Sequence, residues 1–98
     1  TIALVTIDLL WRGTEDEIAR NDGVPFTQRS ASVLVKEAGL APSMKQAGNL
    51  IKGGGVRINN EVVTDPNRMF SLDEVEEPSK AFEVQSGKRG QIILVRPI

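Results

Sequence analysis

The chain has 98 residues, enough for one small domain, and its content of 40% hydrophobic and 26% charged residues is ordinary for a soluble globular fold. It contains neither cysteine nor histidine, which excludes a disulfide framework, a thiolate metal site and the usual imidazole base. The formal net charge of −1 provides no overall attraction to nucleic acid, so the distribution of charge matters more than its sum. The chain begins at Thr1 rather than at a methionine, and we therefore expect it to be part of a longer protein. Its longest apolar run is too short to cross a bilayer, so we expect no membrane partner.

Residues 1–27 predict a leading strand followed by a short acidic helix. The alternation of apolar residues up to Trp11 is typical of a strand. Trp11 could stack on a base, but a lone tryptophan at the end of an apolar strand is more often part of a core. Thr14 and Glu17 have the spacing of a capping box, which predicts a helix over residues 15–20.

The next segment predicts two helices joined by a tight turn. Apolar residues in the first helix recur at the spacing of one helical face, which indicates a side that packs on a core. These residues are Ala31, Leu34, Val35 and Ala38. Gly39 suits the left-handed residue that ends a helix, and Pro42 prevents a simple continuation.

The second helix is expected to start near Met44, because Ser43 and Gln46 again have capping-box spacing. The glycines at 53–55 end it, since glycine is costly to hold in a helix. The apolar stripe predicted to be buried is Met44, Ala47, Leu50 and Ile51. Asn59 and Asn60 can then supply the two positive-φ residues of a type I′ hairpin turn.

The rest of the chain predicts a turn at residues 64–67, a brief strand at 69–71 and a solvated acidic linker at 73–79. A final hairpin pairs residues 81–85 with 91–96 around a basic loop. Together these elements predict an α+β fold, in which two packed helices are followed by a small, mostly antiparallel sheet with a C-terminal hairpin.

Positive charge is concentrated in residues 28–60, which contain five cations and one acidic residue, a local balance of 5 − 1 = +4. Lys45 is expected in the first turn of the second helix, where free N–H groups favour a phosphate. Lys52 and Arg57 flank the glycine hinge, where a nucleic-acid backbone could approach closely. The alternative is that these cations form an ordinary solvated surface.

This helix, turn, helix and hairpin resemble the RNA-binding module named for ribosomal small-subunit protein four. The resemblance rests on Gly-Leu-Ala-Pro-Ser at residues 39–43 and on the helix and Gly-Gly-Val hinge that follow. It departs at Gln46, where the family has glutamate, at Gly48 and Asn49, where arginine is usual, and at Asn60, where glycine is usual. Gly48 is the costliest departure, because it removes a cation and about 1 kcal/mol of helix stability relative to alanine.

The Gly-Lys-Arg turn at residues 87–89 and the Val-Val-Thr-Asp-Pro run at 62–66 further resemble bacterial-type tyrosyl-tRNA synthetases. The departures in the second helix suit a fungal mitochondrial member of that family. The resemblance implies that residues 28–98 are an RNA-binding domain with a C-terminal hairpin. This domain would hold tRNA(Tyr). It would also hold group I intron RNA for splicing.

The same resemblance implies a parent enzyme that uses ATP and tyrosine and forms a homodimer through other domains. Its expected location is the mitochondrial matrix, with the bacterial cytoplasm as the alternative. The segment itself has no catalytic constellation of residues, so we expect it to be neither an enzyme nor a binder of cofactors or metals.

The resemblance also indicates which residues contact RNA. Arg29 and Lys36 match the outward-facing cations of the family's first helix, and Asn59 matches a turn asparagine whose role could equally be structural. The expected contacts are Arg29, Lys36, Lys45, Asn49, Lys52, Arg57, Asn59, Lys88 and Arg89. No base pattern can be named for them, so we expect recognition of backbone and shape. Two alternatives stay open: a protein-interaction module, favoured by the net acidity and the missing arginine, and an RNA-binding appendage of another RNA-modifying or ribosomal protein.

Overall fold

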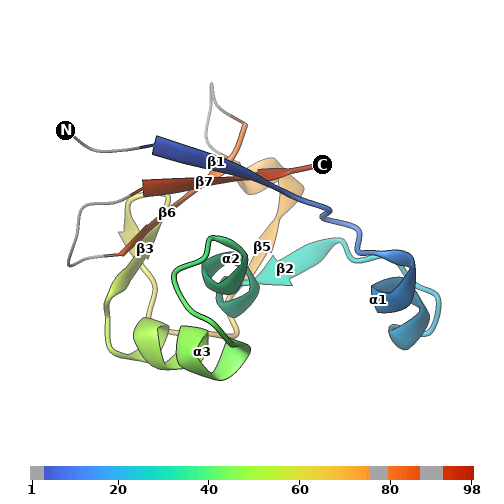
Figure 1. Ribbon diagram of the computed structural model, residues 1–98, viewed down its shortest axis with the longest axis horizontal. Coiled ribbons are helices and arrows are strands. Elements are labelled where there is room, and N and C mark those ends of the chain that lie inside the picture. Colours follow the sequence, from blue (N-terminus) through green and yellow to red (C-terminus); the bar gives the residue numbers. More distant parts are fainter. Residues whose placement is uncertain (1–3, 76–79, 87–91) are drawn as a thin grey trace.

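The computed structural model describes residues 4–75, 80–86 and 92–98. Its main feature is a five-stranded sheet in the order β1-β7-β6-β3-β4 (Figure 1). The strands are β1 (Leu4–Leu9), β3 (Val56–Ile58), β4 (Glu61–Val62), β6 (Phe82–Ser86) and β7 (Ile92–Pro97). β1 is parallel to β7, and the other neighbours are antiparallel. A separate antiparallel pair joins β2 (Gln28–Ser30) to β5 (Met69–Ser71).

The helices α2 (Ala31–Glu37) and α3 (Met44–Lys52) pack against one another below one face of the sheet (Figure 1). The short α1 (Glu15–Arg20) lies to one side, beyond the end of β1 (Figure 1). The predicted α+β fold, with two packed helices and a mostly antiparallel sheet, is therefore confirmed. No helix in the described part of the chain is long and apolar enough to span a membrane.

Local hydrogen bonds account for where the helices begin. Thr14 and Glu17 form the predicted capping box of α1, with each side chain bonded to the backbone N–H of the other residue. Ser43 Oγ accepts a hydrogen bond from the Gln46 N–H at 3.2 Å and so caps α3 where the sequence predicted. Ser30 caps α2 in the same way, a role that the sequence had not indicated.

The turns also follow the chemistry of the residues that form them. Asn59 and Asn60 have φ angles of +53° and +67°, which confirms the predicted turn between β3 and β4. Gly39 has a φ of +79° just beyond α2, as expected for the residue that ends a helix. The acidic segment predicted as a linker is in part structured, because Leu72–Glu74 form a 3₁₀ helix directly after Ser71. The rest of that predicted linker, at 76–79, lies outside the described residues, as does the basic loop with Lys88 and Arg89.

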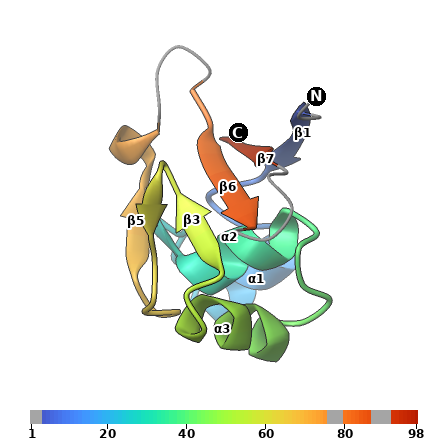
Figure 2. The same ribbon diagram turned by 90° about the vertical axis from the view of Figure 1, so that its left-hand side faces the viewer.

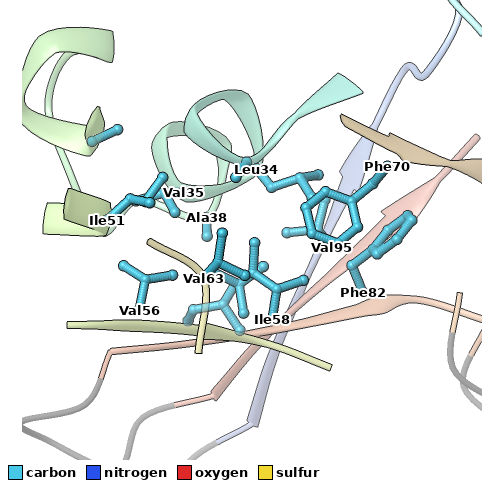
Figure 3. Close-up of a cluster of buried hydrophobic side chains, with 14 of the residues drawn as sticks. Leu34, Val35, Ala38, Ile51, Val56, Ile58, Val63, Phe70, Phe82 and Val95 are labelled. Atoms are coloured by element: carbon cyan, nitrogen blue, oxygen red, sulfur yellow. The ribbon is translucent and has the colours of Figure 1, made fainter. Parts of the chain in front are cut away.

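The core lies between the helices and the inner face of the sheet (Figure 3). Trp11 is only 1% exposed and its ring stacks on Phe82, with centroids 5.1 Å apart. The interpretation of Trp11 as a core residue is thus confirmed. The buried residues of α2 and the sheet include Leu34, Val35, Val56, Ile58, Phe82, Val84, Ile93 and Val95.

The predicted buried stripe of the second helix is only half right. Ala47 and Ile51 are fully buried, whereas Met44 and Leu50 remain 43% and 37% exposed. The reason is the position of α3, which lies farther from the sheet than α2 (Figure 2). A helix in that position buries a narrow side, and the rest of its surface stays open to solvent.

Residues 4–11 are tied into the same sheet as the C-terminal hairpin. β1 pairs with β7 over its whole length, from Leu4 opposite Ile92 to Leu9 opposite Pro97. The N–H of Trp11 then donates to the carbonyl oxygen of Ile98 at 3.2 Å. The proposed division of the chain at residue 28 stays a prediction; what the structure adds is the pairing of its first and last strands.

Candidate nucleic-acid interface

One side of α3 presents a polar stripe built from residues three and four positions apart. Lys45, Gly48, Asn49 and Lys52 follow the spacing i, i+3, i+4 and i+7, which places them on one helical face. Both lysines and Asn49 are exposed, and Gly48 is half-buried. Within the described part of the chain, neither lysine forms an ion pair. The stripe therefore carries two cations that are available to an anionic ligand.

The turn between β4 and β5 faces this stripe and passes beside α3 (Figure 2). Asp65 Oδ1 accepts a hydrogen bond from the Asn67 N–H at 2.9 Å, which fixes the turn locally. Ser32, on α2, then anchors the turn, because its Oγ donates to the carbonyl oxygen of Pro66 at 3.0 Å. A contact between residues 34 positions apart thus sets the distance between the turn and the helix.

Helix and turn enclose an open groove of about 600 Å³, which we call the α3 groove. The residues that line it are Ser32, Met44, Lys45, Gly48, Asn49, Lys52, Asp65, Pro66 and Asn67. Its charged side chains are Lys45 and Lys52 against Asp65, a balance of 2 − 1 = +1 in a molecule whose net charge is −1. A groove with unpaired lysines at both ends of one helical face suits the phosphates of a nucleic-acid strand.

Arg29 is not the outward-facing cation that the sequence predicted. It lies in β2 rather than in a helix, and pairing with Phe70 of β5 turns its side chain inward, so that it is only 5% exposed. Its Nε donates to the Trp11 carbonyl oxygen at 2.9 Å, and its Nη2 donates to the Leu10 carbonyl oxygen at 3.2 Å. Its Nη1 bonds to Glu17 Oε2 at 3.1 Å.

We call this cluster the Arg29 junction: Arg29 with Leu10, Trp11, Glu17 and the Phe26 ring, whose centroid lies 4.2 Å from the guanidinium carbon. The junction connects the leading segment to the rest of the molecule. With its guanidinium occupied in this way, Arg29 is a structural residue, and the prediction that it faces outward is wrong.

Asn59 also has a structural role. Its Oδ1 accepts a hydrogen bond from the Glu83 N–H at 3.0 Å, and its Nδ2 donates to the Glu74 carbonyl oxygen at 2.9 Å. Both ends of the side-chain amide are therefore engaged, and its backbone adopts the positive φ of the turn. Of the two roles that the sequence left open for Asn59, the structure supports the structural one.

Two other predicted contacts, Lys36 and Arg57, lie apart from the α3 groove, whereas Lys88 and Arg89 lie outside the described residues. Lys36 is exposed on α2, beside a smaller hollow of about 250 Å³ that is also lined by Glu17 and Glu37. Arg57 is exposed between the buried Val56 and Ile58, so it lies on the face of the sheet that points away from the helices. The structure thus brings together Lys45, Asn49 and Lys52 from the predicted set, and it separates Lys36 and Arg57 from them.

Sequence reasoning missed the wall of the groove opposite α3. The run Asp65-Pro66-Asn67 is recognisable as a turn, but the sequence does not indicate what the turn packs beside. That information depends on the hydrogen bond from Ser32 to Pro66, which joins distant parts of the chain. The sequence signal for this contact was weak: it consisted of Ser32, a small polar residue at a position predicted to lie in the first helix.

Comparison with known proteins adds a family to this geometry. Residues 32–75, from α2 to the segment that follows the 3₁₀ helix, match the S4 domain, an RNA-binding domain. The matched range contains every residue that lines the α3 groove.

Several curated proteins are similar to the chain over a longer stretch, and the three most informative are each described as a tyrosine–tRNA ligase. The protein from Gluconobacter oxydans is 44% identical over 65 residues, which cover 66% of this chain and 15% of that protein. The protein from Bdellovibrio bacteriovorus is 33% identical over 84 residues, which cover 86% of this chain and 20% of that protein. The protein from Mesorhizobium japonicum is 41% identical over 64 residues, which cover 65% of this chain and 15% of that protein. The chain thus spans a fifth or less of the length of these relatives.

Proposed function

We propose that this chain, which carries an S4 domain at residues 32–75, is the RNA-holding part of a tyrosine–tRNA ligase and binds tRNA(Tyr) in the α3 groove. The observation that carries the proposal is the stripe of Lys45, Asn49 and Lys52 along one face of α3. Both lysines are exposed and are not paired with any acid among the described residues. The similarity to tyrosine–tRNA ligases supports the choice of RNA.

In this proposal the chemistry belongs to the rest of the parent protein. ATP and tyrosine bind to other domains, through which the parent also forms a homodimer. The present segment neither activates tyrosine nor binds a cofactor, and it contributes affinity for RNA. Removing it from the parent should leave tyrosine activation intact and lower the rate of tRNA charging, which an ATP–pyrophosphate exchange assay and an aminoacylation assay measure separately.

We extend the proposal to a mitochondrial parent that also holds group I intron RNA for splicing. Its support is the departure of Gln46, Gly48, Asn49 and Asn60 from the residues usual in the module, which suits an organellar enzyme. Competition between tRNA(Tyr) and a group I intron transcript for this chain tests the RNA partner. The location of the tagged parent protein in cells distinguishes the mitochondrial matrix from a bacterial cytoplasm.

The binding surface can be tested by salt titration. Each lysine that contacts a phosphate adds about 0.7–0.9 to the slope of log affinity against log salt concentration. Lys45→Ala and Lys52→Ala should each lower that slope by about this amount for a tRNA(Tyr) transcript, and both variants should fold normally because exposed substitutions change stability by about 0.5 kcal/mol or less. Arg57→Ala is the matched control, since it removes a cation from the face of the sheet that points away from α3 and its groove.

Equal slopes for the parent chain and the two lysine variants would rule out the α3 groove as the binding site. Tighter binding to a random acidic polypeptide than to tRNA(Tyr) would favour the protein-interaction alternative. Both measurements use the same 98-residue chain and the same fluorescence anisotropy assay.

A further inference from the structure

The strand β1 forms one edge of the five-stranded sheet, and no other described strand lies beside its outer side (Figure 1). It is six residues long, whereas β4, at the opposite edge, has only two. Its sequence, Leu-Val-Thr-Ile-Asp-Leu, contains no lysine, glycine or proline, and its register with β7 is continuous. Proteins usually protect a sheet edge with a short strand, a lysine, a proline or a bulge, because unpaired backbone groups can pair with another chain. None of these devices protects β1.

The even-numbered residues of β1 direct their backbone groups away from the sheet. The carbonyl oxygen of Leu9 accepts a hydrogen bond from the Ile98 N–H at 2.9 Å, and the Trp11 N–H donates to the Ile98 carbonyl oxygen at 3.2 Å. The backbone polar groups of successive strand residues point to alternate sides, so the odd-numbered residues point toward β7. The N–H and C=O groups of Thr6 and Asp8 therefore point outward, and no backbone group of another described element bonds to them.

The side chains of β1 are divided between an apolar and a polar face. Val5 and Ile7 lie on the face that looks toward the core, and Val5 is nonetheless 43% exposed beside the open edge. Thr6 and Asp8 are exposed on the other face. The Asp8 carboxylate accepts a hydrogen bond from Arg96 Nε at 2.8 Å, so its charge is balanced within the chain. A strand that pairs with this edge therefore meets apolar side chains on one face and a hydroxyl with a paired carboxylate on the other.

A second copy of β1 meets these requirements when the two strands run antiparallel about a two-fold axis at Ile7. Ile7 then faces its own counterpart, and Val5 faces Leu9 of the second copy on the apolar side. Thr6 lies opposite Asp8 of the second copy, where its hydroxyl can donate to the carboxylate. The outward backbone groups of these two residues also face each other and can form two hydrogen bonds in each pair. Because both copies use the same strand, the contact closes on itself.

We infer that β1 is an interface through which two copies of this chain associate, by antiparallel pairing of residues 5–9 that joins their sheets. One short strand from each copy buries less surface than a stable dimer requires, so we expect a dissociation constant of about 10–500 μM for the chain. Such a contact becomes effective where two copies are already held close together, as in the homodimer proposed for the parent protein. The inference does not depend on RNA binding and adds a protein partner to the proposed function.

Sedimentation equilibrium of the 98-residue chain tests the association directly. Up to about 1 mM the chain should show a monomer–dimer equilibrium. Thr6→Pro should abolish it, because proline removes the outward N–H and places its ring at the edge, whereas the bonds to β7 come from the odd-numbered residues. Thr6→Ser is the matched control: it keeps both the N–H and the hydroxyl and should associate within about threefold of the unchanged chain. Circular dichroism checks that each variant is folded.

Two charged variants at the same exposed position keep every backbone group and test which residues face each other. Thr6→Glu places a second carboxylate opposite Asp8 in both halves of the contact and should weaken association by about two- to tenfold at low salt. Thr6→Lys places an ammonium group there and should tighten association by about the same factor. A pairing centred on Thr6 would instead bring position 6 opposite itself, so weakening by both charged variants would overturn the proposed register.

The charged variants also decide the question if Thr6→Pro fails to fold, since neither removes a hydrogen bond within the chain. A chain that stays monomeric at about 1 mM would overturn the inference and leave the proposed function standing. Association that neither charged variant changes would overturn it as well, because the contact would then lie elsewhere on the molecule.

Discussion

The Arg29 junction and the α3 groove are both built around cations that the sequence marks as RNA contacts, and they differ in what surrounds those cations. The guanidinium of Arg29 is covered by Phe26 and bonded to two carbonyl oxygens and a carboxylate. The ammonium groups of Lys45 and Lys52 reach solvent beside an open groove. The planar fork of arginine suits several simultaneous bonds within a fold, whereas lysine stays hydrated at a surface. Arg29 is therefore committed to contacts within the fold, whereas the two lysines are free to take the binding role proposed for them.

The largest expected effect on stability comes from removing the guanidinium group from the Arg29 junction. Arg29→Met keeps most of the apolar bulk but removes three hydrogen bonds. We expect a loss of about 2–3 kcal/mol in the free energy of unfolding, because buried carbonyl groups lose their partner. Urea denaturation followed by circular dichroism measures it. Arg57→Met, at an exposed position, is the control and should change stability by about 0.5 kcal/mol or less.

The same variant tests the comparison directly. Folded Arg29→Met chain should bind tRNA(Tyr) with the salt slope of the parent chain, because the guanidinium is not available to a phosphate. A lower slope in a variant of unchanged stability would mean that Arg29 contacts RNA and that the two regions are not distinct.

A smaller effect is expected from the acidic residue inside the α3 groove. Asp65→Asn keeps the Oδ1 atom that accepts from the Asn67 N–H and removes a negative charge near the lysines. Exposed charge interactions contribute about 0.2–1 kcal/mol, so we expect RNA to bind about two- to fivefold more tightly at low salt and with a smaller gain at high salt. Glu61→Gln, at an exposed position outside this groove, is the matched control. Unchanged RNA affinity in Asp65→Asn would mean that phosphates do not approach this turn.

The smallest expected effect is a pH dependence of the Arg29 junction. The hydrogen bond from the Thr14 N–H, and then the guanidinium of Arg29, hold the pKa of Glu17 below its ordinary value of 4.5. A lowered folded-state pKa gives stability that is present above the ordinary value and is lost as the pH falls through the folded-state pKa. Parent stability should therefore decrease slightly more than that of Glu17→Gln below pH 4.5. If the urea midpoints of the two proteins changed equally with pH across that range, the pairing of Glu17 with Arg29 would be contradicted.

The features that the sequence predicted correctly are local. Capping at Thr14 and Ser43, the positive φ of Gly39 and the Asn59–Asn60 turn each depend on residues within a few positions. The hydrophobic stripe of α2 was predicted for the same reason, because one face of a helix is read from its own spacing. Lys45 and Lys52 were identified as candidates from their places in the first turn of the helix and beside the glycine hinge, and the structure shows that they share one helical face with Asn49.

The features that it could not predict depend on contacts between distant segments. Arg29 was assigned to a helix. Its burial follows from the pairing of β2 with β5, a strand that comes after the β3–β4 hairpin in the chain. Met44 and Leu50 fit an apolar stripe, yet the position of α3 leaves both exposed. The second wall of the groove requires the bond from Ser32 to Pro66. Periodicity indicates which residues share a face and does not indicate what that face meets.

The parallel pairing of β1 with β7 has a mechanical consequence. Because both strands run in the same direction, the start of β1 and the end of β7 lie at opposite ends of their shared ladder (Figure 1). A pulling force applied through these two points would load the ladder in shear, along the strands, so that its hydrogen bonds would have to break together rather than one after another. We therefore expect the pair to resist extension more than a hairpin pulled open from its ends.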